Sequence, residues 1–167
     1  MTHPSLGLPS PDPTAGLPAA ALRLRSTGAR LARLAMQNTV RLSPGFDERY
    51  DETALRLFLR DMERHIEQLA RALETGNDSF VTNYGEWLVP VYRRRRVPMR
   101  DVISQLAGLR QAAATVLSPE ENEAARELFE AWAQRLRHHQ RLAGDHKGNP
   151  IVRFFWKGAG ILDDEIV

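Results

Sequence analysis

The sequence contains no cysteine among its 167 residues. This absence excludes disulfides, thiolate zinc sites, cysteine-ligated iron–sulfur clusters and cysteine nucleophiles, and it fits a reducing compartment. Lysine is scarce as well, because Lys147 and Lys157 are the only two and arginine supplies nearly all of the positive charge. Arginine is the side chain that pairs bidentately with carboxylates and phosphates.

Long apolar segments are also missing. No run approaches the roughly 20 apolar residues that span a bilayer, and the N-terminus lacks the charged region and apolar core of a secretion signal. The formal net charge is only +2, and no broad basic face with interleaved aromatics is evident, so we expect no nucleic-acid binding. These features predict a soluble, cytoplasmic protein of one domain.

The chain divides into three parts by composition. Residues 1–18 are rich in proline, glycine and serine and are expected to be disordered. Residues 19–144 carry helical patterns and form the predicted bundle. Residues 145–167 form an extended tail with a high density of apolar side chains, which must be buried against something.

In the middle part, apolar residues recur at three- and four-residue spacing, the pattern of helices with one buried face. The clearest stripe consists of Leu55, Phe58, Leu59, Met62, Ile66, Leu69 and Leu73. Helices are predicted over about 19–42, 51–75, 79–88, 98–117 and 118–142. Their short connections favour antiparallel neighbours, so we predict an all-α fold, a globin-like or antiparallel helical bundle of four to five helices.

Several residues mark helix ends. Asp51 lies near the start of the second predicted helix, and Gly76 stands at its end, where a left-handed cap belongs. Ser118 opens a capping box for the last helix. Pro90 lacks an amide hydrogen, so the third helix is predicted to kink or end near Leu88.

The first helical segment, 19–42, is basic and contains no acidic residue. Its arginines are Arg23, Arg25, Arg30, Arg33 and Arg41. One interpretation is an amphipathic helix that contacts an anionic membrane or an acidic partner. The other, which we favour, is a bundle helix with a solvated basic face. Gly28 in its middle predicts a kink or a marginal helix.

A run of four arginines, Arg93, Arg94, Arg95 and Arg96, precedes the helix that restarts at Pro98. Such a cluster can bind phosphate or an acidic partner. The interpretation that we favour is a solvated turn, in which the arginines pair with carboxylates such as Glu86 and Asp101 and with the carbonyl groups at helix ends.

The histidines suggest no metal or haem centre. His65 lies between the stripe positions Met62 and Ile66, so we interpret it as a boundary or surface residue, and no second haem ligand is evident. A second group resembles metal ligands by residue type and comprises His138, His139, Asp145 and His146. Adjacent helical residues point about 100° apart, so the first two cannot easily share one ion. We predict no cofactor.

The C-terminal part carries the residues of a docking segment. Its apolar side chains include Ile151, Phe154, Phe155, Trp156, Ile161 and Leu162. Aromatic anchors followed by a glycine hinge suit insertion into a partner. The tail either folds back on the bundle or docks into another chain, and we favour docking in a homo-oligomer or a larger assembly.

Two adjoining stretches, LFLRDMERHIEQLARALETGNDSF (57–80) and EWLVPVYRRRRVPMRDVISQLAGLRQAAATVL (86–117), resemble a known family. They are similar to the N-terminal sensor domain of RsbR-related stressosome proteins, and the similarity covers about residues 46–136. It rests on the helix ending in ALETG, the arginine run and the Val97-Pro98 restart. The resemblance implies an all-α module that dimerises and passes a signal to an output domain.

These features predict a non-enzymatic sensory or adaptor subunit that oligomerises and docks a partner protein through its aromatic tail. No residue set pairs a nucleophile with a base, so no catalytic residue is predicted. One alternative is a small-molecule sensor with a pocket between the helices around Tyr84, Trp87 and Trp132. Another is a peripheral membrane protein that makes a weak surface contact through residues 19–42.

Overall fold

The computed structural model describes residues 16–145, which form six α-helices and one 3-10 turn and contain no strand. The elements are α1 (Pro18–Ser26), α2 (Gly28–Leu42), η1 (Asp47–Arg49), α3 (Glu52–Thr75), α4 (Ser79–Arg94), α5 (Met99–Ala113) and α6 (Pro119–Ala143). The predicted all-α helical bundle is confirmed. None of the helices in these residues is both long and apolar enough to cross a membrane.

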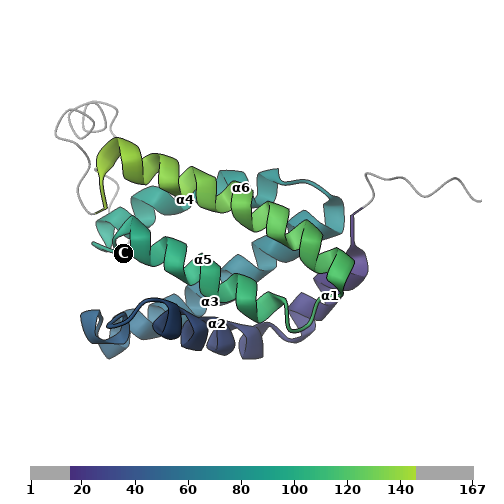
Figure 1. Ribbon diagram of the computed structural model, residues 1–167, viewed down its shortest axis with the longest axis horizontal. Coiled ribbons are helices and arrows are strands. Elements are labelled where there is room, and N and C mark those ends of the chain that lie inside the picture. Colours follow the sequence, from purple (N-terminus) through teal and green to yellow (C-terminus); the bar gives the residue numbers. More distant parts are fainter. Residues whose placement is uncertain (1–15, 146–167) are drawn as a thin grey trace, which may run out of the picture.

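The helices surround one hydrophobic core. α2 packs against α3 and α5, α6 packs against α4 and α5, and α1 lies on α3. In Figure 1, α4 and α6 lie on one side of the molecule and α2 lies on the opposite side, with α5 between them. The largest side chains without exposed surface are Trp132, Tyr92, Phe46 and Phe58.

The predicted helix ends are confirmed where a side chain or a glycine forms the cap. Asp51 accepts a hydrogen bond from the amide of Ala54 at 2.7 Å, and Gly76 ends α3 with a φ of 66°. Ser118 and Glu121 form the reciprocal capping box of α6. These helix ends depend on contacts between residues that are close in the sequence, so the sequence alone can predict them.

The predicted segment 19–42 is two helices rather than one, which raises the number of helices to six. The break falls at Thr27, between α1 and α2. Thr27 donates its hydroxyl to the carbonyl of Arg23 at 2.7 Å, and Ser26 donates to the same carbonyl at 3.1 Å. Hydroxyl groups that bond to nearby backbone compete with helical bonding, and Gly28 adds a poor helix former at the same point.

Two further boundaries differ from the sequence interpretation. α4 does not end near Leu88 but continues through Pro90 to Arg94. Leu88, Val89 and Tyr92 are buried on both sides of the proline, so their packing compensates for the missing hydrogen bond. At the N-terminus, the amide of Leu17 donates to the carbonyl of Leu73, so residues 16–18 belong to the bundle and not to the predicted disordered segment.

The contact between α2 and α5 depends on a glycine. Asn38 donates to the carbonyl of Gly108 at 3.2 Å. A Cβ atom added to Gly108 would lie 2.4 Å from Oγ1 of Thr39 and 2.5 Å from the carbonyl oxygen of Ala35. The two backbones are therefore too close for any side chain at this position.

We expect Gly108→Ala to lower the free energy of unfolding by about 2 kcal/mol, because the added methyl must push α2 and α5 apart. Gly28→Ala is the matched control, since a Cβ there meets no atom within 4 Å, and it should leave stability unchanged or slightly raised. Urea denaturation followed by circular dichroism measures both. Equal effects of the two substitutions would contradict the close contact.

Candidate functional site

A chain of hydrogen bonds runs through the interior between α3 and α4, with His65 at its centre. His65 has no exposed surface; its Nδ1 lies 3.1 Å from the hydroxyl of Tyr84 and its Nε2 lies 3.2 Å from the hydroxyl of Tyr92. The Tyr92 hydroxyl lies 3.2 Å from Oδ2 of Asp61, and Nη1 of Arg95 donates to the same oxygen at 2.6 Å. The chain therefore links Tyr84, on the outer side of α4, to the arginine turn.

The bonding pattern determines the tautomer of His65. An ionised carboxylate only accepts hydrogen bonds, so Tyr92 donates to Asp61. The Tyr92 oxygen then accepts from Nε2–H of His65, and Nδ1 accepts from the hydroxyl of Tyr84. His65 is neutral, protonated on Nε2 and bonded at both nitrogens.

The pKa values agree with this assignment. Burial, together with the positive charge of Arg64, lowers the pKa of His65 from 6.5 to about 3. Burial and then the negative charge of Asp61 raise the pKa of Tyr84 and of Tyr92 above the ordinary value. All three groups are consequently uncharged at neutral pH.

The buried position of His65 shows that the interpretation as a boundary or surface residue is wrong. Asp61 and His65 lie four residues apart, and with Phe58 and Leu69 they recur at three- and four-residue spacing. That spacing places all four on the same buried face of α3. The signal was therefore present in the sequence, but polar residues in an apolar stripe are identified as buried only when their partners are known.

Trp132 of α6 closes the cluster around His65. Its ring lies edge-on to the imidazole with 5.3 Å between the ring centroids, and it has no exposed surface. The close approach of Trp132 to α4 requires a glycine at residue 85, because a Cβ atom there would lie 2.9 Å from Cδ1 of Trp132. The indole Nε1 has no hydrogen-bond partner among the described residues, so Trp132 contributes packing to the cluster.

The outward face of α4 carries a row of apolar side chains, which we call the α4 strip. It consists of Phe80, Tyr84, Trp87 and Val91, of which Trp87 is exposed and the other three are half-buried. Trp87 is 54% exposed, and its ring stacks on Tyr84 with 5.6 Å between centroids and 19° between planes. Since Tyr84 is itself bonded to His65, the buried chain holds the exposed indole in place. An exposed indole that is held in one position is typical of contact sites, where tryptophan is enriched.

The four arginines of residues 93–96 have different environments. Arg93 donates to the carbonyl oxygens of His139 and Gly144, both at 3.1 Å, and so caps the end of α6. Burial lowers the pKa of Arg93. Arg95 binds Asp61, and Arg94 and Arg96 are exposed.

The turn itself is a helix-ending motif. Arg96 has a φ of 58°, and the amides of Arg96 and Val97 donate to the carbonyls of Arg93 and Tyr92. This is the Schellman pattern, in which glycine usually occupies the left-handed position. The interpretation of this run as a solvated turn holds for Arg94 and Arg96, which are exposed, and Arg93 makes the expected bonds to helix carbonyls. The expected carboxylate partners are wrong, because Arg95 binds Asp61.

The carboxylates that were expected to bind the arginine run have other partners. Glu86 contacts His139 and lies 3.7 Å from Arg135. Asp101 is 1% exposed, accepts from Arg49 at 2.9 Å and from the hydroxyl of Tyr50 at 2.5 Å. The sequence cannot reveal these pairs, because the partners lie 49 to 53 residues away in the chain.

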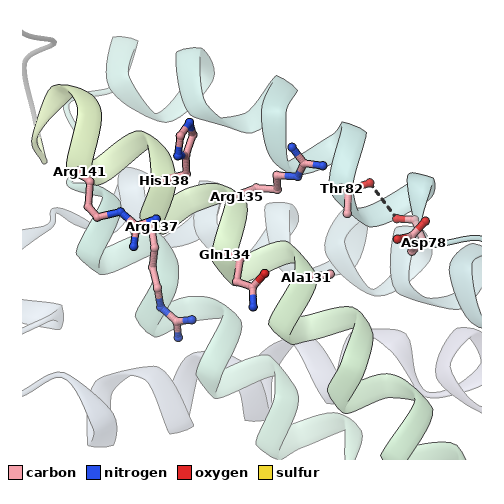
Figure 2. Close-up of a pocket in the computed structure, with 8 residues that line it drawn as sticks. All are labelled: Asp78, Thr82, Ala131, Gln134, Arg135, Arg137, His138 and Arg141. Atoms are coloured by element: carbon pink, nitrogen blue, oxygen red, sulfur yellow. Dashed lines mark hydrogen bonds between the residues drawn. The ribbon is translucent and has the colours of Figure 1, made fainter.

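An open groove of about 600 Å³ lies between the start of α4 and the second half of α6 (Figure 2). It is lined by Asp78, Thr82, Ala131, Gln134, Arg135, Arg137, His138 and Arg141. Glu86 and Glu130 partly neutralise it through Arg135 and Arg137. The groove is therefore a weakly basic surface hollow and not an enclosed cavity.

The histidines of α6 do not converge on one point. His138 lines the groove, whereas His139 contacts Glu86. Within residues 16–145, no group of three or more histidine or acidic side chains is arranged to hold a metal ion. His146 lies outside the described residues.

The three residues of the predicted pocket lie next to one another. The ring centroid of Tyr84 is 5.6 Å from that of Trp87 and 5.6 Å from that of Trp132. None of them lines the groove of Figure 2, so a pocket among them stays a prediction. The predicted tail residues lie outside the described part of the chain, namely Ile151, Phe154, Phe155, Trp156, Ile161 and Leu162.

No protein-family model and no curated protein matches this chain. The resemblance to the RsbR-type sensor domain therefore stays a prediction from the sequence.

The burial of His65 makes stability depend on pH. Because the folded pKa of about 3 is below the unfolded value of 6.5, the unfolded chain binds the proton between these pH values. The stabilisation is present above pH 6.5 and decreases as the pH falls, by about 2 kcal/mol between pH 7 and pH 5. Chemical denaturation at each pH measures it. His65→Gln should lack this dependence, and parallel pH profiles of the two proteins would contradict the assignment.

Two neighbouring arginines of the turn, Arg94 and Arg95, should differ in how much their substitution lowers stability. Arg95→Ala should lower the free energy of unfolding by about 2 kcal/mol, because it removes the closer ion pair of the buried Asp61 carboxylate, at 2.6 Å, and leaves only the pair with Arg64 at 3.9 Å. Arg94→Ala removes the same charge from an exposed side chain and should change stability by less than about 0.5 kcal/mol. Thermal and urea unfolding of both variants test this. Similar losses would contradict separate roles for the two arginines.

Proposed function

We propose that this protein is a non-enzymatic adaptor or sensor subunit that acts through protein–protein contact and self-associates through the α4 strip. The observation that carries the proposal is Trp87, which is more than half exposed yet stacked on Tyr84. Tryptophan is the residue most enriched at the energetic centres of interfaces. An indole that is already ordered before binding loses little conformational entropy on association.

The bonding of the polar groups supports a role without catalysis. His65 uses both ring nitrogens within the fold. Asp61 is bound by Arg95 and Tyr92, and Asp101 is bound by Arg49 and Tyr50. A general base needs a free acceptor within reach of its substrate, and these buried groups direct their acceptors at other side chains.

A second copy of the chain is the partner that we propose for the α4 strip. A single row of apolar side chains along one helix is self-complementary when two copies meet across a two-fold axis. The resemblance of residues 46–136 to RsbR-type sensor domains, which dimerise, points to the same partner. The tail residues Phe154, Phe155 and Trp156 are proposed to dock a different protein, and we propose a cytoplasmic location for the assembly.

A small-molecule sensor is the second candidate. The basic groove of Figure 2, with Arg135, Arg137 and Arg141, supports an anionic ligand of small size. This function needs no contact through the α4 strip, so the same experiment separates the two candidates.

Sedimentation of the full chain over a concentration series tests the proposal. We expect a dimer whose dissociation constant rises roughly thirtyfold in Trp87→Gln, which corresponds to the loss of about 2 kcal/mol at an interface centre. Leu22→Gln is the matched control, because Leu22 is 68% exposed on α1, and it should dimerise like the unmodified chain.

Two outcomes would count against self-association through the α4 strip. One is a chain that remains monomeric at every concentration, which would favour the sensor candidate if a small anion is retained on purification. The other is a Trp87→Gln variant with unchanged affinity and an intact helical spectrum.

A further inference from the structure

A second surface lies on the outward face of α2, on the side of the molecule away from α4 (Figure 1). We call it the α2 face, and it consists of the exposed residues Arg30, Arg33, Gln37 and Arg41. The opposite side of α2 is buried against the bundle through Leu31, Ala32 and Ala35. The side of this helix that is available to a partner is therefore mainly polar, with Leu34 and Val40 half-buried.

The α2 face carries charge of one sign. α2 contains no acidic residue, and the one acidic residue of the neighbouring α5, Asp101, is 1% exposed and bound by Arg49. Arg30 and Arg33 form no ion pair with another described residue. Their positive charges are therefore directed at solvent.

The arginines of α1 differ from those of α2. Arg25 pairs with Glu67 at 3.0 Å and with Glu74 at 2.9 Å, and Arg23 pairs with Glu121. The basic segment 19–42 is thus divided by the break at Thr27. Its first arginines hold α1 on the bundle, and its later arginines form an external surface.

A hollow of about 430 Å³ lies on the α2 face. It is lined by Arg30, Arg33, Leu34, Gln37 and Thr115. Guanidinium groups bind phosphate oxygens in a bidentate geometry, and the amide of Gln37 adds a neutral donor. This combination of two guanidinium groups and one amide suits a phosphate group that is part of a larger polar headgroup.

The surroundings of the hollow indicate which phosphate source fits. Leu34 and Val40 are partly exposed beside the arginines, and Leu42 is 45% exposed at the end of α2. Neither α2 nor α5 contains an aromatic residue, so this face offers no platform on which bases could stack. Arginines interleaved with aliphatic side chains suit the headgroup region of a bilayer.

We infer that the α2 face binds the anionic surface of a phospholipid bilayer, with a lipid phosphate in the hollow between Arg30 and Arg33. Because the apolar side of α2 is buried in the core, the contact is electrostatic and does not insert the helix. The inference is independent of the proposed function, since α4, the helix that carries the α4 strip, lies on the other side of the molecule (Figure 1).

Co-sedimentation of the full chain with vesicles tests the inference. Vesicles of phosphatidylcholine mixed with phosphatidylserine should pellet the protein, and vesicles of phosphatidylcholine alone should not. Arg30→Ala with Arg33→Ala should weaken partitioning roughly thirtyfold, since each basic residue near an anionic bilayer contributes about fivefold. Added salt should release the bound protein.

The control variant carries Arg94→Ala with Arg96→Gly, since glycine suits the left-handed backbone at residue 96. It removes the same charge from exposed positions at the end of α4 and in the turn after it, away from α2. It should bind anionic vesicles like the unmodified chain, as should Trp87→Gln, whose sedimentation tests the proposed function separately.

Four results would overturn the inference. They are no binding of the full chain to anionic vesicles, equal binding to neutral vesicles, equal losses in the two double variants, and preferential binding of a DNA duplex that depends on Arg30 and Arg33. The last result would assign the same basic face to a nucleic acid.

Discussion

The structure depends on the burial of two polar side chains, His65 and Asp61, on the inner face of α3. A buried imidazole or carboxylate is costly unless its hydrogen bonds are satisfied. Tyr84, Tyr92 and Arg95 of α4 and its terminal turn supply these bonds. The requirement therefore sets how α4 lies along α3, and with it the position of the α4 strip on the molecular surface.

Two buried carboxylates of the bundle, those of Asp61 and Asp101, have their hydrogen bonds satisfied in the same way. Asp61 accepts hydrogen bonds from Arg95 and Tyr92, and Asp101 accepts hydrogen bonds from Arg49 and Tyr50. Asp61 joins α3 to the turn after α4, and Asp101 joins α5 to the segment before α3. A buried ion pair adds little net stability, but removing one partner strongly lowers the free energy of unfolding because the other charge stays buried and unpaired. These two clusters thus select one arrangement of helices from those that an apolar core alone would permit.

The arginines divide into internal and external groups. Arg23, Arg25, Arg49, Arg93 and Arg95 bond to carboxylates or carbonyls of other elements. Those on the α2 face are exposed, and α2 lies on the side of the molecule opposite to α4. With both proposals, one molecule would present an apolar strip to a second copy and a basic face to a lipid surface without competition between them.

The features that the sequence predicts correctly are local ones. The periodic stripe of α3, the caps at Asp51, Gly76 and Ser118 and the all-α class follow from spacing and from contacts within a few residues. Even the break at Thr27 had a partial signal in Gly28.

The roles of the polar residues follow from the folded arrangement of the helices, because their partners lie far away in the sequence. His65, interpreted from the sequence as a boundary residue, lies in the core because tyrosines from α4 satisfy its hydrogen bonds. The helix α4 continues through Pro90 because the residues on both sides of the proline are buried against other helices. Arg94 and Arg95 are identical and adjacent, yet one is solvated and the other binds a buried carboxylate. Residue type and spacing cannot distinguish such neighbours, because the difference lies in whether folding brings a carboxylate from a distant part of the chain next to the side chain.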